Sequence, residues 1–423
     1  MSVRTIKGLR WWMMGLLMVG AIINYLTRST LAVAAPTLLP DLHIGPKEYS
    51  WILNTFQATI MLQPLCGLVM DTIGLKLAMI IFATAWSLIT MAHGLAHSWP
   101  VLAGLRGLMG FAEGSANPGG MKATAEWFPA KERGFAGGMF NIGASFGSML
   151  APPLVGAAIL FFSWQAAFVF AGALGLVWVF AWWRLYHAPD RHPAMSAEER
   201  AYISAGQEAH LRGDAQRPSF RAILGRRNFW GIALPRFLAD PAWAALTFWV
   251  PLYLSQVRHF NLKEIALTAW LPFLAADLGC FFGGVVVAFL QRRGVGLINA
   301  RRGAFTVGAC LMTGLAFVGL VQDPYVAVAL LCLGGFAHQT LSVTVITMSS
   351  DLFKRSEVAT AAGLAGTFGN AGMLAFNAVI GVLVLKIGYT PFFIALAGLD
   401  LVGAAILWTV VRERPAAGEG EKT

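Results

Sequence analysis

The pentapeptide "GFAEG" at residues 110–114 returns as "GFAHQ" at residues 335–339, 225 positions later in the chain. The repeat continues at the same offset, where four residues recur: Phe128, Glu132, Ala136 and Gly138 match Phe353, Glu357, Ala361 and Gly363. Earlier in the halves, Pro36 and Gly67 match Pro251 and Gly283 at offsets of 215 and 216. Internal repeats of this kind are a signature of transporters. The repeat therefore predicts two related halves of six helices each.

The composition indicates a chain that is made for a lipid bilayer. Hydrophobic residues make up 57% of the 423 residues and charged residues only 12%, against about 25% charged residues in a typical soluble domain. A helix that spans a bilayer needs about 20 mostly apolar residues. Twelve such runs follow one another: 11–39, 49–70, 75–95, 99–121, 134–160, 165–186, 228–256, 265–290, 303–321, 325–349, 360–386 and 390–411. The sequence predicts an all-α polytopic membrane protein.

The net charge of +10 follows the loops between these runs. If both termini are cytoplasmic, the inner segments hold 24 of the 31 Lys and Arg residues and the outer loops hold four. The remaining three, Arg28, Arg106 and Arg236, lie inside apolar runs. Such a bias is the positive-inside rule. We interpret the basic loops as topology signals and expect both termini in the cytoplasm and no nucleic-acid partner.

Four segments organise the chain: an N-terminal six-helix bundle (1–186), a cytoplasmic inter-bundle loop (187–227), a C-terminal six-helix bundle (228–411) and a cytoplasmic tail (412–423). The loop is the most polar segment. Within it, Ser196 and Glu199 have the spacing of a capping box, which predicts a short surface helix. We interpret the loop mainly as a linker between two moving bundles.

Ionisable residues inside the apolar runs are the functional candidates. Each costs about 2.5–3.5 kcal/mol or more to insert into a bilayer, so it is kept for a reason. Seven lie inside the runs: Arg28, Arg106, Glu113, Arg236, Asp240, Asp277 and Asp400. Arg236 and Asp240 are four residues apart and can pair on one helix face, either as a structural pair or as part of a site. For Asp400, on the last run, we expect a structural hydrogen-bonding role.

Arg28 lies in the polar stretch "INYLTRST" (23–30) of the first run, with no acid within a helical turn. Either Glu113 or Asp277 reaches it from another helix, or a substrate carboxylate does. A guanidinium binds a carboxylate through two parallel hydrogen bonds. We favour substrate binding for Arg28.

Glu113 is the candidate proton carrier, and Arg106 lies two helical turns before it on the same stripe. The alternative is that Glu113 is a static partner of Arg106. His338, at the matching point of the second half, titrates near neutral pH in water. Hydrogen bonding and proton coupling both stay open for it, with contact to a substrate favoured.

The sequence contains no pattern that indicates a metal site, a cofactor or an enzyme. The four cysteines lack metal or redox spacing, and only His338 of the eight histidines lies deep in an apolar run. A nutrient sensor with a transporter fold is a rival interpretation, as is an exporter.

The stretch "GLVMDTIGLK" (67–76) resembles the Gly-x-x-x-Asp-Arg-x-Gly-Arg-Arg/Lys motif of the major facilitator superfamily. The positions that match are Gly67, Asp71, Gly74 and Lys76. Thr72 and Leu75 replace two arginines of the motif, which implies a weaker cytoplasmic gate. "AEWFPAKERG" (125–134), with Arg133, resembles the loop after the fourth helix of that family.

Within the superfamily, the chain resembles the anion:cation symporters, and most closely the bacterial hexuronate transporters, over nearly its whole length. Among the matching stretches are "YLTR", "EWFPAKER", "FWGIALPRFLADPAW" and "GGFAHQ". The resemblance implies a major facilitator fold, with 12 transmembrane helices in two pseudo-symmetric six-helix bundles. It also implies proton-coupled import of glucuronate or galacturonate across the bacterial inner membrane, by alternating access and as a monomer.

The resemblance also implies roles for individual residues. Tyr25 and Arg28 match substrate residues of the first helix, and Asn370 matches a substrate contact of the eleventh. Arg106 and Glu113 match a pair in which the Glu titrates. Thr27 stands where many galactonate carriers have a second proton-carrying Asp.

Arg236 is expected to contribute a further substrate contact. His338 and Gln339 are expected to do so as well, since "GFAEG" and "GFAHQ" are expected at equivalent points of one central cavity. The alternatives are a symporter for another sugar acid of the galactonate or glucarate type, one for another organic anion, and an exporter of the same superfamily.

Overall fold

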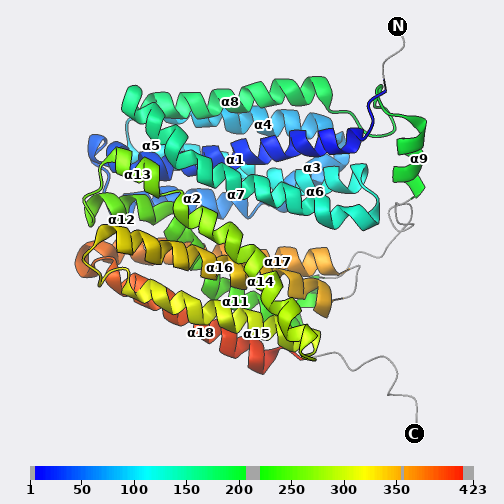
Figure 1. Ribbon diagram of the computed structural model, residues 1–423. Helices are drawn as coiled ribbons and strands as arrows, with labels where there is room; N and C mark the ends of the chain where they lie inside the picture. The colour runs from blue at the N-terminus through cyan, green and yellow to red at the C-terminus, as the bar shows by residue number, and fades with distance from the viewer. Residues whose placement is uncertain (1–4, 206–219, 354–356, 413–423) are drawn as a thin grey trace. The chain divides into compact units, whose positions relative to one another are not determined.

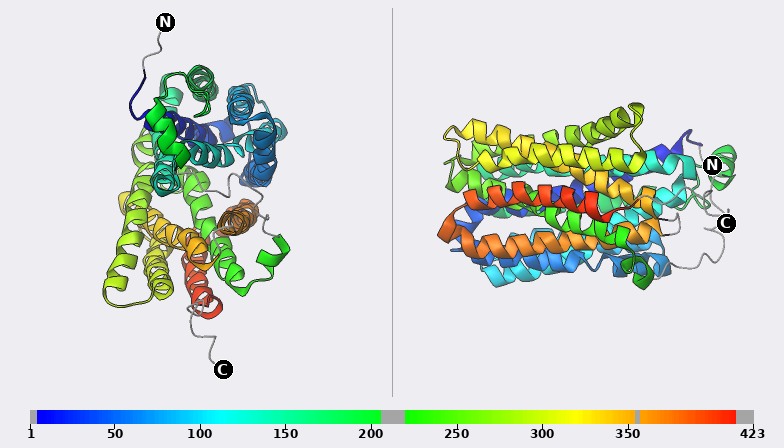
Figure 2. Two further views of the ribbon diagram at one scale, coloured as in Figure 1. Left: turned by 90° about the vertical axis from the view of Figure 1, so that its right-hand side faces the viewer. Right: turned by 90° about the horizontal axis from the view of Figure 1, so that it is seen from below.

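A computed structural model describes residues 5–205, 220–353 and 357–412, and this part of the chain is helical without strands. Contacts divide the chain into two compact units. Unit 1 consists of Met1–Ala215 and Thr247–Trp270, and unit 2 of Gln216–Leu246 and Leu271–Thr423. Within each unit, the long helices run side by side along a common direction (Figures 1 and 2).

Unit 1 is built from long apolar helices with short breaks at Gly, Pro and Ser. Its helices are α1 (Leu9–Asp41), α2 (Pro46–Ile60), α3 (Gln63–Ile73), α4 (Leu75–His93), α5 (Trp99–Glu113), α6 (Ala116–Trp127), α7 (Ala130–Phe161), α8 (Trp164–Leu185), α9 (Ala197–Ala205), α12 (Val250–Gln256) and α13 (Leu262–Thr268). Glycines let helices approach closely. For example, a Cβ at Gly147 of α7 would lie 2.3 Å from the Ile22 carbonyl oxygen of α1.

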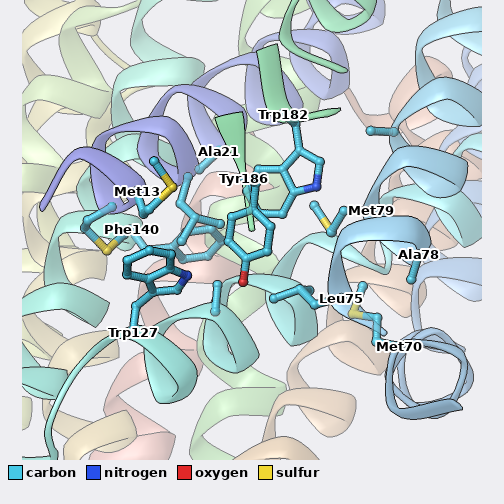
Figure 3. Packing of buried hydrophobic residues seen from close by; sticks show 14 of the residues in the cluster. Met13, Ala21, Met70, Leu75, Ala78, Met79, Trp127, Phe140, Trp182 and Tyr186 are labelled. Atoms are coloured by element: carbon cyan, nitrogen blue, oxygen red, sulfur yellow. The ribbon is translucent and has the colours of Figure 1, made fainter. Parts of the chain in front are cut away.

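Aromatic rings fill one end of the unit 1 core. Trp182 and Tyr186 stack with ring centroids 3.9 Å apart, and Trp127 lies beside Tyr186 at 6.3 Å (Figure 3). All three side chains are at most 1% exposed. The Tyr186 hydroxyl donates to Glu126 at 3.0 Å, so the polar end of the buried ring is satisfied, as buried tyrosines require.

Unit 2 contains α10 (Phe220–Leu224), α11 (Arg227–Ala244), α14 (Leu271–Arg292), α15 (Leu297–Met312), the 3₁₀ turn η3 (Thr313–Phe317), α16 (Pro324–Leu352), α17 (Val358–Ile387) and α18 (Thr390–Val410). A π-helical turn, η2 (Ala245–Trp249), joins α11 to α12. Pro241 in α11 has no N–H, which frees the carbonyl of Phe237. A Cβ at Gly372 of α17 would lie 2.1 Å from that oxygen, so α17 packs directly on the irregular part of α11.

The sequence repeat is also a packing repeat. A Cβ at Gly110 would lie 2.5 Å from the Phe56 oxygen in unit 1, and one at Gly335 would lie 2.3 Å from the Pro272 oxygen in unit 2. Phe56 and Pro272 are themselves 216 positions apart. The predicted pseudo-symmetry of the two halves is therefore confirmed at the level of helix contacts.

Nine helices of the described residues are long and apolar enough to cross a membrane, or ten if α2 and α3, bent by 41°, form one span. The predicted run 99–121 is divided between α5 and α6 at Gly114–Ser115. Pro118 explains the break, because it offers no N–H to the Gly114 carbonyl. The run 303–321 is realised as α15 followed by η3. The count of twelve spans stays a prediction.

Residues 247–270, which were expected in the C-terminal bundle, make their contacts in unit 1. The Tyr49 hydroxyl donates to the Phe248 carbonyl at 2.9 Å, and a Cβ at Gly156 would lie 2.7 Å from the Ala266 Cβ. The predicted bundle boundaries at 186 and 228 stay predictions. The tail after Arg412 lies outside the described residues.

The short helix predicted in the inter-bundle loop is present as α9, close to the start of α1 (Figures 1 and 2). Ser196 caps it by accepting from the Glu199 N–H at 3.1 Å. The Glu199 carboxylate does not complete the capping box. It accepts from the Leu9 N–H at 3.0 Å and from the Arg10 side chain at 2.9 Å, so it caps α1 and holds α9 on unit 1.

Candidate functional site

A buried ion pair in unit 1 joins α1 to the end of α5. Arg28 Nε lies 3.0 Å from Glu113 Oε2, and the Thr27 hydroxyl donates to Glu113 Oε1 at 3.1 Å. The Glu113 side chain is 0% exposed and the Arg28 side chain 15%. Of the two alternatives for an acid that reaches Arg28, the structure selects Glu113.

Neighbouring side chains on α1 and α2 hold the Arg28 guanidinium. Its second amino group, NH2, donates to Asn24 Oδ1 at 3.3 Å. The guanidinium carbon lies 4.4 Å from the centre of the Tyr25 ring and 5.3 Å from that of Phe56. Cation–π contacts of this kind strengthen when the site is dry. The guanidinium is thus oriented from several sides while part of it stays accessible.

Arg106 does not pair directly with Glu113, contrary to the alternative that Glu113 is its static partner. It donates through NH2 to the Arg28 backbone carbonyl at 2.9 Å and through NH1 to Met109 Sδ at 3.4 Å. Arg106 and Glu113 lie two helical turns apart on α5. Glu113, the last residue of the helix, is turned toward α1, so the two side chains do not meet. Arg106 is 1% exposed and acts as a buried positive charge that ties α5 to α1.

The matching region of unit 2 has different chemistry. Arg236 and Asp240 form the predicted ion pair at 3.2 Å on α11. His338 of α16 is 3% exposed, and its ring stacks on Trp243 at 5.4 Å with an angle of 21° between the planes. The Phe273 ring packs edge-on against the Trp243 ring, with the ring centroids 5.5 Å apart. Unit 2 therefore presents an aromatic pair beside a neutralised ion pair.

The other predicted contacts of unit 2 are Gln339 on α16 and Asn370 on α17, and both side chains are partly exposed. A Cβ at Gly369, next to Asn370, would lie 1.8 Å from Asp240 Oδ2, so the glycine is what admits the carboxylate between α11 and α17. Substrate roles for Gln339 and Asn370 stay predictions.

Asp400 of α18 differs from its expected hydrogen-bonding role. It is 0% exposed, and neither carboxyl oxygen has a hydrogen-bond partner among the described residues. Within the same residues, no group of three or more His, Cys, Asp or Glu side chains is arranged to hold a metal ion.

The residues of the predicted gating motif make their contacts within unit 1, and Asp71 to Gly74 lie exposed on it. Gly74 separates α3 from α4 with a φ of +85°, a conformation that favours glycine. A Cβ at Gly67 would lie 3.8 Å from the Pro118 Cβ. Asp71 pairs with Lys122 of α6, and Lys76 Nζ lies 3.3 Å from His187 Nε2. The side chain of Arg133 lies outside the described part of the structure.

Sequence reasoning missed Phe56, Lys122 and Trp243 as members of these clusters. The repeat could have indicated Trp243, because it lies 216 positions after Thr27, which contacts Glu113. Phe56 and Lys122 carry no signal of their own, since an apolar residue in a span and a lysine in a loop are ordinary.

Known proteins resemble the chain over its whole length. The family description "Major Facilitator Superfamily" matches residues 17–334 and 295–423. A hexuronate transporter of Escherichia coli K12 is 48% identical over 423 residues, which is 99% of this chain and 98% of that protein. A galacturonate transporter of Dickeya chrysanthemi is 50% identical over 328 residues, 77% of this chain and 95% of that protein.

A solved structure shares the fold. It is a bacterial homologue of the human lysosomal transporter Spinster, in an inward-facing and unoccupied conformation, with a TM-score of 0.73. The match covers 95% of each chain at 16% sequence identity.

Proposed function

We propose that this chain, which belongs to the Major Facilitator Superfamily, is a symporter that imports a hexuronate together with protons across the bacterial inner membrane. Membership and the apolar helices make it a multi-pass membrane transporter. The substrate class rests on the relatives, whose names are hexuronate and galacturonate transporter. Transport would proceed by alternating access, in a monomer with both termini in the cytoplasm.

The Arg28–Glu113 pair carries the proposal. A sugar acid brings a carboxylate, and Arg28 is the partly accessible cation that a carboxylate would bind through two hydrogen bonds. In the structure, Glu113 already occupies one edge of that guanidinium, at 3.0 Å. Substrate and Glu113 therefore compete for one cation.

The competition supplies the coupling between proton and substrate. When Glu113 takes up a proton, its attraction to Arg28 falls and the guanidinium becomes free for the substrate carboxylate. When substrate leaves, Arg28 again favours the ionised Glu113 and the proton is released. Coupling of this kind is reciprocal in free energy, so proton binding strengthens substrate binding by the same factor as the reverse.

Unit 2 would contribute contacts to the rest of the sugar. The Trp243–His338 stack offers an aromatic surface for the apolar face of a pyranose, and Arg236, Gln339 and Asn370 offer donors for its hydroxyl groups. Tyr25 would help to hold the substrate at Arg28, while Arg106 positions α1 through the Arg28 carbonyl.

The test is uptake of glucuronate and galacturonate into proteoliposomes under an imposed inward proton gradient, with wild type and Glu113→Gln. We expect accumulation by wild type and none by the variant, because an amide cannot exchange a proton. Counterflow exchange of substrate, which needs no net proton movement, is expected to persist in the variant.

The matched control is Glu198→Gln, which removes an exposed carboxylate of α9 and should leave uptake unchanged. Gradient-driven accumulation by Glu113→Gln would refute the coupling role. Failure of folded wild type to take up either uronate would refute the substrate class, and galactonate and glucarate would then be tested, since a probable L-galactonate transporter is 30% identical over 78% of this chain.

A further inference from the structure

One end of unit 2 carries an open cleft of about 350 Å³ that no transport role uses. Its walls are formed by the start of α11, the end of α16 and Arg412, which lies two residues beyond the end of α18. Its lining residues are Arg226, Arg227, Asn228, Leu352, Phe353 and Arg412. Half of the lining is cationic and two residues are apolar.

The three arginines differ in how their charge is compensated. Arg226 is neutralised, because both of its amino groups donate to Glu357, at 2.6 and 2.7 Å. Arg227 donates only to backbone carbonyls, those of Val410 at 3.0 Å and Thr409 at 2.7 Å. Within residues 5–205, 220–353 and 357–412, no carboxylate pairs with Arg227 or Arg412. The cleft thus presents two positive charges that no carboxylate of the described residues compensates.

The backbone around the cleft is held in place. Asn228 and Arg412 exchange two hydrogen bonds, from the Asn228 side-chain amide to the Arg412 carbonyl at 3.0 Å and from the Arg412 N–H to Asn228 Oδ1 at 2.9 Å. These bonds fasten the end of α18 to the start of α11. The cationic cleft is therefore a built feature of two helix ends.

Two tryptophans indicate the level of the cleft in the membrane. Trp408 lies in the last turn of α18 and is 48% exposed, with its indole N–H donated to Thr306 at 3.0 Å. Trp230 lies in the first turn of α11 and donates to the Leu224 carbonyl at 2.8 Å. Indoles at helix ends are typical of the level of the lipid headgroups. The cleft, formed by the same helix ends, lies at that level.

We propose that this cleft binds the phosphate group of an anionic phospholipid. Arg227 and Arg412 would hold the phosphate, and Leu352 and Phe353 would contact the glycerol and the first acyl carbons. Basic pockets at the ends of transmembrane helices bind anionic headgroups in this way. The apolar wall and the level of the tryptophans favour a lipid over a free phosphate ion. The site shares no residue with the proposed substrate and proton groups.

The test uses purified full-length protein in a neutral detergent, titrated with phosphatidylglycerol, phosphatidylcholine or inorganic phosphate, while the unfolding temperature is measured. We expect phosphatidylglycerol to raise the unfolding temperature saturably and the other two to have little effect. In Arg227→Gln/Arg412→Gln, half-saturation should need roughly tenfold more phosphatidylglycerol, since each cation near a lipid surface contributes to binding.

Three further variants separate lipid binding from other causes. Arg292→Gln/Arg293→Gln removes two exposed charges at the end of α14 and should behave as wild type. Arg412→Gln alone leaves the bonds from Arg227 to α18 intact, and it should still weaken lipid binding. Arg227→Lys/Arg412→Lys keeps both positive charges and should bind the lipid like wild type. If the α14 variant also needed about tenfold more phosphatidylglycerol for half-saturation, the binding would be general charge attraction, and the site would be refuted. Equal stabilisation by inorganic phosphate would refute the lipid assignment.

Discussion

Glu113 and His338 occupy equivalent positions, 225 residues apart, yet the helices that carry them differ. The glycine three residues before each packs on a backbone carbonyl of the neighbouring helix in the same way. However, α5 ends at Glu113, whereas α16 continues through His338 to a total of 29 residues. After the shared tripeptide, unit 1 has Gly and Pro and unit 2 has none before Leu352. The end of α5 leaves Glu113 at a helix terminus, facing α1.

The partners of the two residues are equivalent as well. Thr27 contacts Glu113 in unit 1 at 3.1 Å, and Trp243, 216 positions after Thr27, stacks on His338 in unit 2. One pair of helix positions thus holds a hydrogen-bonded carboxylate in one half and two stacked rings in the other. The halves share their packing and differ in their chemistry.

Other charges recur in both halves. Arg10 pairs with Glu132 at 3.0 Å, and the equivalent Arg226 pairs with Glu357 at 2.6 Å. We infer that these duplicated pairs hold helix ends together, while the Arg28–Glu113 pair, present in one half only, serves transport.

The largest effect should come from Arg28→Gln, because this substitution removes the ion pair that distinguishes unit 1 from unit 2. It leaves the buried Glu113 without its cation and removes the proposed carboxylate ligand, and truncating one partner of a buried pair costs about 3–5 kcal/mol. We expect uptake to fall at least roughly 100-fold, measured in proteoliposomes on protein shown to be folded. Arg28→Lys should rescue little, since an ammonium cannot reproduce the planar fork. Retained uptake in Arg28→Gln would refute the assignment.

The next effect tests the shared packing. Gly110→Ala and Gly335→Ala each place a methyl group within 2.5 Å of a carbonyl oxygen, and overpacking of this kind costs about 1–3 kcal/mol. We expect both to lower the unfolding temperature by similar amounts. Gly104→Ala and Gly284→Ala, where a Cβ would meet nothing within 4 Å, are the controls and should not destabilise. A loss in only one half would contradict the equivalence.

A smaller effect tests the aromatic half. Trp243→Ala removes the ring on which His338 stacks. We expect KM for the uronate to rise roughly two- to tenfold, in line with the loss of an aromatic contact of about 0.5–1.5 kcal/mol. The dependence of uptake on the proton gradient should not change. Trp243→Phe, which keeps a ring, should stay close to wild type. A changed proton dependence in Trp243→Ala would mean that unit 2 also takes part in coupling.

The smallest effect concerns a histidine outside the spans, as a contrast to His338. Burial lowers the pKa of His192, so the folded protein binds a proton on this side chain less readily than the unfolded chain does. As pH falls below about 6.5, the unfolded chain binds the proton first and stability decreases. We expect His192→Gln to reduce the decline of the unfolding temperature between about pH 7 and pH 5. If the unfolding temperature of His192→Gln declined as steeply as that of wild type, other titratable groups would cause the decline.

Several features could be predicted from the sequence because their causes are local. A spanning helix satisfies its own backbone, so apolar length alone predicted most helices. The pair Arg236–Asp240 lies on one helix face and was predicted from its spacing. The break in the helix after Glu113 was not predicted, although Pro118 lies close to it in the sequence, because the apolar run continues across the break.

Long-range pairing could not be predicted in the same way. Arg28 needed an anion, and the sequence left Glu113, Asp277 and a substrate carboxylate as candidates; the placement of α5 shows that Glu113 reaches it. The Glu199 carboxylate was expected to cap its own helix and caps α1 instead, which only the placement of α9 reveals.

The sequence by itself determined a helical membrane protein with a duplicated half. It also identified the ionisable residues inside the apolar runs as functional candidates, because each is costly to insert into a bilayer. Tertiary structure alone decided which of those charges meet. The reason is physical: apolar length and spacing act within one helix, whereas the encounter of Arg28 with Glu113, and of Trp243 with His338, depends on how small residues let neighbouring helices approach and turn.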